Sequence, residues 1–529
     1  MPLFGFSGDN EREKVIVLLT MCFALAMAML DNTVVNVALP SISKDLGAGL
    51  SELQWIVDAY VLAFASLLLT GGILGDRYGR KRMFLAGLTV FTVFSLACGL
   101  ATSPSQLIIA RTLQGVGGAL LIPGTLSIIT VTFPPHERAK ALGLWAGVSG
   151  IALALGPTLG GWMVEHLGWE SVFFLNVPIG IIAFLVAMST VRESRSENER
   201  ALDIVGLILG TSSLVFVTYG LIEGNSLGWT SPRIVGSLLL FAVLLGSFLW
   251  WELRYEHAMM PLRFFRIPAF SAGNTVAFAI SMGMFATFFF LTIYMQTIHG
   301  YSPFQAGAAF LPMTLAIIIT APNAGKYASK HGSRAPMTYG LCLAGGGLIA
   351  LGILLTPTTA YWMMVPIFIA MGHGMGATMA PMTAAVMNSV GRERAGLGSA
   401  MTNTSREVGG VLGIALLGAI LSSQIRTAFA PAIASLGLTA DQAGTVAASA
   451  QRGGLNVAGL SPEQAAGVKA AFDTAFMQGF RPALLFAGTV LLVAAFVSNR
   501  FIPGRDTIAH HHAAADASES DAGEPVVAH

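Results

Sequence analysis

Long runs of apolar residues, separated by short polar breaks, dominate this chain of 529 residues. A run of about 18 or more apolar residues is long enough to cross the hydrocarbon core of a bilayer. Backbone groups in lipid must be satisfied within their own segment, and these runs do not alternate with period two, so we predict helices and not a β-barrel. The pattern predicts fourteen membrane-spanning helices, at residues 15–38, 53–74, 83–102, 106–132, 139–163, 171–191, 204–223, 233–252, 270–297, 304–326, 335–356, 362–389, 396–422 and 480–499.

Lysine and arginine residues gather in the loops on one side of the predicted bilayer. Seventeen lie on that side, whereas the short loops of the opposite side hold two, Lys44 and Arg233. Because basic loops are retained in the cytoplasm, this bias predicts a multi-pass protein of the inner (plasma) membrane with both termini cytoplasmic. The first of these termini is the short segment 1–14, and the second is a tail at 500–529 whose composition is typical of disorder.

The sequence contains an internal repeat. The segment GILGDRYGRKR (72–82) follows the second apolar run, and GKYASKHGSR (325–334) follows the tenth. A second pair of similar segments, GGALLIP (117–123) and MGATMAP (375–381), lies in the fourth and twelfth runs. Both copies have the same orientation in the membrane, which is typical of two bundles related by an axis along the membrane normal.

The predicted fold class is therefore an all-α membrane protein with two six-helix bundles in parallel repeat. The bundles are expected at 15–191 and 270–499, and two extra transmembrane helices link them at 204–252. Within the second bundle, the segment 424–479 is rich in alanine and polar residues. We expect it to form an extracellular hairpin of two short amphipathic helices.

Composition narrows the classes of function. Hydrophobic residues make up 54% of the chain and charged residues 11%, and the net charge of +1 gives no electrostatic basis for binding nucleic acid. The sequence shows no nucleophile triad, phosphate loop or metal-ligand spacing, so we expect neither an enzyme nor a cofactor or metal site. The expected partners are a small-molecule substrate and the lipid bilayer, and the expected state is a monomer.

Three ionisable residues are predicted at one depth in the N-terminal bundle: Asp31, Asp58 and Arg111. Ionisable side chains inside membrane spans are costly and are functional candidates by default. Burial favours the neutral form of a carboxyl and a nearby arginine favours the ionised form, so their balance suits reversible proton binding. The alternative is that Arg111 pairs statically with one aspartate, or with backbone carbonyls, and only fixes the packing.

The C-terminal half offers one acid at membrane depth, Glu407, next to Arg406. Glu407 is a candidate for proton coupling or substrate contact, with a structural charge pair as the alternative. His373, between two glycines, could titrate, although a hydrogen-bonded packing role is the simpler interpretation. The remaining candidates for the lining of a substrate cavity are polar residues within the spans: Asn36, Gln114, Gln296 and Asn403.

Four motifs in order resemble the major facilitator superfamily, and specifically its fourteen-span drug:proton antiporters of the QacA/EmrB type. They are LDNTVVNVALP (30–40), GGILGDRYGRKR (71–82), RTLQGVGGALLIP (111–123) and GLWAGVSGIALALGPTLGG (143–161), and SVFFLNVPIG (171–180) is also similar to this branch. The chain departs from the pattern at Ala152, where glycine is usual. It also has no acid in the tenth span, which argues against recognition of dications.

The resemblance implies roles for the matched positions. Asp31 and Arg111 would serve proton coupling. A cytoplasmic latch that stabilises the outward-open state by charge pairing would consist of Gly72, Asp76, Arg77, Gly79 and Arg80. The antiporter motif that shapes the fifth span would consist of Gly143, Gly156, Pro157, Gly160 and Gly161.

These features together predict a proton-coupled antiporter that exports amphipathic drugs or related small molecules by alternating access. One alternative is a narrow-specificity exporter of one endogenous metabolite, lipid or antibiotic with the same fold. Another is a membrane sensor that transports nothing, which the latch motif and the intramembrane acids disfavour.

Overall fold

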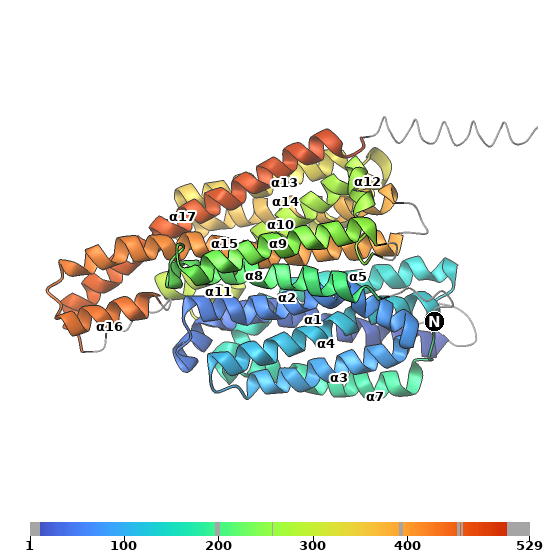
Figure 1. The fold of residues 1–529 in the computed structure, drawn as a ribbon, viewed down its shortest axis with the longest axis horizontal. Helices are drawn as coiled ribbons and strands as arrows, with labels where there is room; N and C mark the ends of the chain where they lie inside the picture. The colour runs from blue at the N-terminus through green and yellow to red at the C-terminus, as the bar shows by residue number, and fades with distance from the viewer. Residues whose placement is uncertain are drawn as a thin grey trace, which may run out of the picture.

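A computed structural model describes residues 11–195, 202–255, 258–390, 395–451, 455, 457 and 459–504. All regular secondary structure in these ranges is helical (Figure 1). Thirteen helices are long and apolar enough to cross a bilayer, and α5 supplies a fourteenth span when its two segments, bent by 44°, are counted together. The predicted all-α membrane fold is thereby confirmed.

The first six spans form one bundle, which is the lower one in Figure 1. Its helices are α1 (Glu11–Leu46), α2 (Leu50–Tyr78), α3 (Arg80–Gly99), α4 (Pro104–Thr132), α5 (Pro135–Leu167), and the short α6 (Ser171–Phe174) followed by α7 (Asn176–Thr190). The two linking helices are α8 (Ile204–Leu227) and α9 (Pro232–Arg254).

The second bundle begins after a single 3-10 turn, η2 (Leu262–Arg266). Its helices are α10 (Pro268–Ile293) continued by η3 (Tyr294–Ile298), α11 (Pro303–Ala308), α12 (Leu311–His331), α13 (Arg334–Leu354), α14 (Tyr361–Ser389), α15 (Ala395–Ala434), α16 (Ala440–Gln451) and α17 (Pro462–Phe501). We call the end of the molecule that carries residues 76–82, 192–195 and 262–266 the basic end, and the other end the far end.

The two bundles pack their helices in the same pairs. In the first bundle α4 packs on α2 and α3, and α1 packs on α5. In the second, α14 packs on α12 and α13, and α10 packs on α15. Glycines permit the close approach in both copies, because a Cβ at Gly117 would lie 2.4 Å from the Phe91 backbone nitrogen and one at Gly374 would lie 2.4 Å from the Gly340 oxygen. The repeat in the sequence is thus a repeat in packing.

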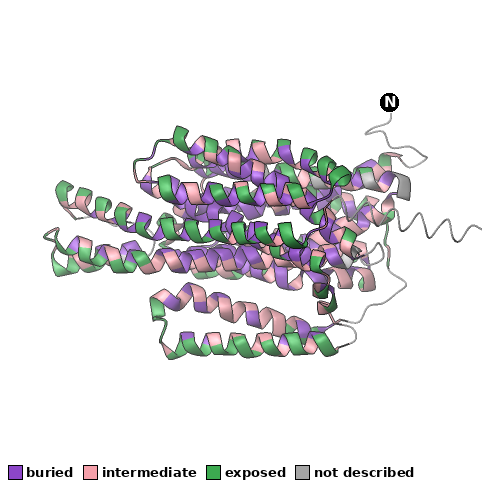
Figure 2. Cartoon of the chain, turned by 90° about the horizontal axis from the view of Figure 1, so that it is seen from above, coloured by how far each residue is buried: buried purple, intermediate pink, exposed green. Residues whose placement is uncertain are grey.

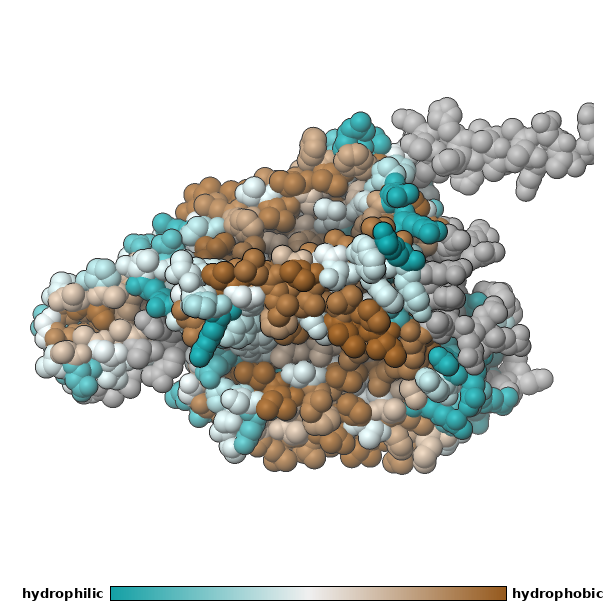
Figure 3. Space-filling view, viewed as in Figure 1, coloured by the Kyte–Doolittle hydropathy of each residue, from teal (hydrophilic) through white to brown (hydrophobic). Residues whose placement is uncertain are grey.

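The outer surface fits a bilayer. Figure 3 shows a broad hydrophobic belt around the middle of the molecule, with hydrophilic residues concentrated toward its two ends. Buried residues line the interior of the helix assembly, and exposed residues cover its outer faces (Figure 2). Large apolar side chains such as Ile182, Leu239 and Phe496, each within a membrane-spanning helix, are exposed, as is expected where lipid covers them.

The linking helices α8 and α9 lie in front of the two bundles in the view of Figure 1. Helix α8 packs on α2 from the first bundle and on α15 from the second. At the far end its Glu223 accepts hydrogen bonds from Ser51 and from the Trp55 ring nitrogen, while Asn225 donates to the Ala419 oxygen at 2.6 Å. The linker therefore bridges the seam between α2 and α15.

Direct polar contacts between the two bundles lie toward the far end. Gln54 donates to the Ile414 oxygen at 2.8 Å, and Gln296 donates to the Val37 oxygen at 2.9 Å. The backbone nitrogen of Phe304 donates to Glu165 at 3.1 Å. These contacts tie α1, α2 and α5 to the second bundle, so the structure is closed at its far end.

The glycines of α5 are also closely packed toward the far end and loosely packed toward the basic end. A Cβ at Gly161 would lie 2.3 Å from the Pro303 oxygen of the other bundle, and nearer the middle of the span a Cβ at Gly156 would lie 1.9 Å from Thr33 of α1. In the half of α5 toward the basic end, Gly143, Gly147 and Gly150 have no such neighbour within 4 Å. The described chain therefore leaves this half of α5 unpacked at its glycines.

The segment 424–479 differs from the predicted hairpin of two short helices. Helix α15 continues without a break to Ala434, and α17 begins already at Pro462, so only α16 is a separate short helix. Each of the two long helices has 40 residues, about 60 Å, whereas the hydrocarbon core is about 30 Å thick. Both helices therefore project past the far end (Figure 1).

Candidate functional site

The centre of the first bundle holds a buried network around Asp31 of α1. One carboxylate oxygen accepts a hydrogen bond from Arg111 of α4 at 2.5 Å. The other accepts from the amide groups of Gln114 and Asn176, each at 2.9 Å. The side chains of Asp31 and Arg111 are both 0% exposed. Three donors from two other helices thus hold Asp31 in a site buried from bulk solvent, where ionic hydrogen bonds are strong.

Arg111 is held from several sides besides Asp31. Its Nε donates to the Ile56 carbonyl at 3.2 Å, and its Nη1 also donates to Gln114 at 2.9 Å. The guanidinium lies 4.1 Å from the centre of the Tyr60 ring. Its remaining nitrogen, Nη2, has no hydrogen-bond partner among the described residues. The guanidinium is thus also held by a cation–π contact with Tyr60 and, at 5.8 Å, by one with Phe173.

Three further residues, Tyr60, Asn176 and Ser95, belong to this site and were not predicted from the sequence. Asn176 donates to the Ser95 hydroxyl at 2.9 Å as well as to Asp31, and Ser95 donates to the Phe173 carbonyl at 2.8 Å. Asn176 lies within the quoted segment SVFFLNVPIG, where an amide in an apolar span is itself a signal. No comparable signal distinguishes Tyr60, because an aromatic residue in a span is usually lipid-facing or packed.

Asp58 does not join this network, which corrects the expected convergence of the three ionisable residues. Asp58 is 0% exposed, and neither of its carboxyl oxygens has a hydrogen-bond partner among the described residues. The depth was predicted from helix rise, but the direction around the helix was not. Ile56 and Tyr60 face Arg111, whereas Asp58 shares the face of Gln54, one turn away, toward the seam with α15.

Glu407 of α15 lies on the other side of this seam. Its Oε2 is buried without a hydrogen-bond partner in the described chain, and the same holds for the Nε of Arg406. Glu407 interacts electrostatically with Arg406, but no direct ion pair joins the two side chains in the described part of the structure. Helix α2, which carries Tyr60, packs directly on α15, which carries Glu407. The helix that holds Arg111 in place is therefore also the helix that meets the acid-bearing helix of the second bundle.

The other cavity candidates are dispersed. His373 shares a hydrogen bond of 2.8 Å with Thr320 and has its ring edge-on to Tyr339, so it is engaged in packing within the second bundle. Asn36 donates to the Asn32 carbonyl at 3.4 Å, and its own side-chain oxygen has no partner within the described ranges. Gln296 belongs to the closed far end described above. Asn403 lies half-buried on α15, one turn before Glu407.

The antiporter motif falls into two groups. Gly156, Pro157, Gly160 and Gly161 are all buried, and a Cβ at Gly160 would lie 2.5 Å from Val34. A Cβ at Gly307 of the second bundle would lie 2.0 Å from the Pro157 oxygen, so the motif forms part of the far-end closure. Gly143 is apart from this contact and has open space around it.

The latch motif lies at the basic end between α2 and α3. Arg80 donates to Asp76 at 2.8 Å, and Gly79 has a φ of 116°, which favours glycine. Glu193, which the sequence analysis did not identify, accepts hydrogen bonds from the backbone nitrogens of Lys81 and Arg82. Arg77 lies 5.5 Å from the centre of the Tyr78 ring, and Gly72 packs near Pro123. These latch contacts stay within the first bundle.

Comparison with known proteins agrees with this architecture. The family model described as Major Facilitator Superfamily matches residues 21–414. The tetracenomycin C resistance and export protein of Streptomyces glaucescens is 34% identical over 91% of this chain and 90% of its own length. Multidrug resistance protein Stp of Mycobacterium tuberculosis is 31% identical over 96% and 95%, and the methylenomycin A resistance protein of Streptomyces coelicolor is 36% identical over 79% and 87%.

Among solved structures, a bacterial homologue of the human lysosomal transporter Spinster, in an inward-facing and occupied conformation, has a TM-score of 0.64. The match covers 94% of this chain and 98% of that one at 18% sequence identity, so it concerns the fold alone.

Proposed function

Because the chain belongs to the major facilitator superfamily, we propose that it is a proton-coupled exporter that moves amphipathic drug-like molecules out of the cytoplasm by alternating access. Three relatives named for antibiotic or multidrug resistance, each matched over most of its length, support export. The observation that carries proton coupling is the fully buried Asp31–Arg111 pair, beside the Tyr60 ring of α2, a helix that packs on α15 of the other bundle.

The basic end is proposed to face the cytoplasm, because basic loops are retained there. Both termini then lie on the cytoplasmic side of the plasma membrane, and the closed far end faces outward. With the contacts of Gln54, Gln296 and Glu165 in place, the structure corresponds to a state that is shut toward the outside. We propose a monomer that uses the transmembrane proton gradient and no cofactor.

The proposed coupling starts with protonation of Asp31. A neutral Asp31 no longer compensates the charge of Arg111, and an uncompensated buried charge is costly. Arg111 already lies over the Tyr60 ring of α2, and α2 packs on α15, the helix of the second bundle that carries Glu407. Protonation therefore shifts the balance of attraction across the seam between the bundles, which is how a proton can bias their rocking motion. One proton moved through 100 mV supplies about 2.3 kcal/mol.

The test uses the full chain reconstituted in proteoliposomes with an imposed pH gradient and ethidium as the cargo. We expect ethidium movement that depends on the gradient and a matching proton flux. Asp31→Asn should abolish the proton flux and gradient-driven accumulation. The matched control is Asp441→Asn, an exposed acid of α16, which should behave as the parent chain. Gradient-driven accumulation that persists in Asp31→Asn contradicts coupling through Asp31.

A narrow-specificity antibiotic exporter is the second candidate. Two of the relatives above are named for single antibiotics, tetracenomycin C and methylenomycin A. A susceptibility panel in cells that express the chain distinguishes the two functions. Protection against chemically unrelated compounds supports multidrug export, whereas protection against one compound class supports the narrow function.

A further inference from the structure

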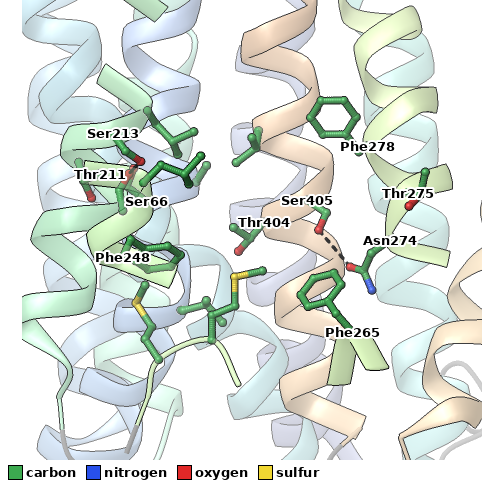
Figure 4. A pocket seen from close by; sticks show the side chains of 18 residues that line it. Ser66, Thr211, Ser213, Phe248, Phe265, Asn274, Thr275, Phe278, Thr404 and Ser405 are labelled. Carbon is green, nitrogen blue, oxygen red and sulfur yellow. Dashed lines mark hydrogen bonds between the residues drawn. The ribbon is translucent and has the colours of Figure 1, made fainter. Parts of the chain in front are cut away.

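A cavity of about 360 Å³ lies beside the seam between α2 and α15, enclosed further by α8, α9 and α10 (Figure 4). We call it the side cavity. Its walls include Phe248 of α9 and Phe278 of α10, and two methionines, Met259 and Met260, come from the loop after α9. The side cavity is lined by both bundles and by the linker, and it is separate from the Asp31 network, because none of its lining residues belongs to that network.

Three hydroxyl groups that line the side cavity lack hydrogen-bond partners. Ser66 of α2, Thr211 of α8 and Thr404 of α15 each have a buried side-chain oxygen with no partner among the described residues. Ser66 is only 8% exposed, so bulk solvent does not satisfy it. Serine and threonine in helices usually bond the carbonyl one turn back, and these three do not. Three unsatisfied hydroxyls from three helices around one cavity point to an occupant that supplies their partners.

The lining also limits the charge of that occupant. Among the described residues that line the side cavity, none is acidic or basic. Aromatic and methionine side chains offer a soft apolar surface that adapts to different shapes. Met259 and Met260 are held in place because their backbone nitrogens donate to Asp203 at 3.2 Å and to Glu252 at 2.8 Å. The volume falls within the range of roughly 300–1,000 Å³ that is usual for small-molecule sites.

The side cavity continues the helix face of Asp58. Ser66 follows Asp58 by eight residues, which is about 12 Å along α2 on the same face. The opposite wall, with Thr404, belongs to α15, which carries Glu407 one turn later. An occupant of the side cavity therefore touches both halves of the seam, and rocking of the bundles must alter its contacts.

We propose that the side cavity is a cargo site for uncharged, largely apolar molecules that carry hydrogen-bonding oxygen atoms. The proposal rests on the proposed export function and names the class of cargo and the place where it binds. Charged amphipaths use a different part of the protein, because no described residue of the side cavity wall compensates a charge.

Binding of Nile red, an uncharged apolar dye with a ring carbonyl, to the detergent-purified full chain tests the proposal. The hydroxyl-free variant combines Ser66→Ala, Thr211→Val and Thr404→Val, which keep nearly the same shape. We expect its Kd for Nile red to rise at least about tenfold. Without dye its unfolding temperature should be equal or higher, because unsatisfied hydroxyls have been removed. An unchanged Kd, or a lower unfolding temperature, overturns the proposal.

The matched control is Thr218→Val. Thr218 lies two turns after Thr211 on α8, has a buried hydroxyl without a partner in the described chain, and does not line the side cavity. It should leave the Kd unchanged. A second variant, Leu214→Trp, fills the side cavity and should remove saturable binding. Displacement of Nile red by the cation ethidium at equal concentration contradicts the assigned cargo class.

Transport measurements in proteoliposomes distinguish three cases: failure of the cargo site, failure of the export function, and occupation of the cavity by lipid. If the parent chain exports ethidium with the gradient but the hydroxyl-free variant exports Nile red normally, the side cavity is not a cargo site and the export function stands. If the variant binds Nile red weakly while the parent chain exports neither dye, the site stands and the export function fails. Displacement of Nile red by phospholipid, with export unaffected in the variant, assigns the cavity to lipid and overturns the cargo role.

Discussion

Replacement of Asp31 by asparagine should destabilise the protein strongly, because it leaves Arg111 charged and buried. Both side chains are 0% exposed, so solvent screening does not reduce the effect. Removal of one partner of a buried ion pair costs about 3–5 kcal/mol. Asparagine keeps one oxygen that Arg111 or Gln114 can donate to, which places the expected loss near the lower limit, about 3 kcal/mol.

The free energy of unfolding can be measured by denaturant titration in mixed micelles, for the parent chain and for three variants: Asp31→Asn, Arg111→Gln and the combination of both. The double variant removes both charges, so it should be more stable than the sum of the single losses predicts. We expect a coupling energy of at least about 1.5 kcal/mol between the two sites. A loss of unfolding free energy below about 1 kcal/mol in Asp31→Asn, or additive losses in the double variant, would refute the claim that Asp31 compensates the buried charge of Arg111.

Three further changes test other parts of the structure. Asp58→Leu should leave the free energy of unfolding unchanged or raise it, because an unpartnered buried carboxyl is removed, and a loss above about 1 kcal/mol would show that Asp58 has a structural partner. Gly307→Ala should open the far end, because its Cβ would lie 2.0 Å from the Pro157 oxygen; labelling of a cysteine introduced at the far end in place of Gln296 should accelerate, whereas Gly147→Ala, in open space, should not change it. Ser461→Ala removes the capping box that starts α17 and should cost about 1 kcal/mol locally, visible as faster amide exchange in the first turn of that helix and unchanged exchange elsewhere.

The sequence predicted the spans because burial in lipid demands one continuous apolar helix per crossing, and that demand is local. The parallel repeat was also readable, since equivalent loops recur at equivalent places. What failed was the direction of side chains around a helix. Asp58 was placed at the right depth on α2, but two residues separate it from Ile56 and from Tyr60, and this offset turns it away from Arg111.

Contacts between helices explain why other residues of the site could not be predicted from the sequence. Asn176 and Tyr60 belong to the site only because α7 and α2 bring them to Asp31 and Arg111, and no local pattern reports such a meeting. The start of α17 at Pro462 has a local signal, the capping box of Ser461 and Gln464, that the amphipathic interpretation overlooked. The unsatisfied hydroxyl of Thr404 cannot be recognised from sequence, because whether it finds a hydrogen-bond partner depends on which side chains pack beside it in the fold.

The long helices α15 and α17 extend from the second bundle, so their outer ends move farther than the rest of the bundle when it rotates. Each is unbroken over about 60 Å, so tilting the bundle by one degree displaces the tip by roughly 1 Å relative to the other end of the helix. A fluorophore on the turn at Gly437, where the chain leaves α15, would magnify small rotations into distances that single-molecule energy transfer resolves. The conformational cycle of this protein could then be timed from a surface position that touches neither the proton nor the cargo.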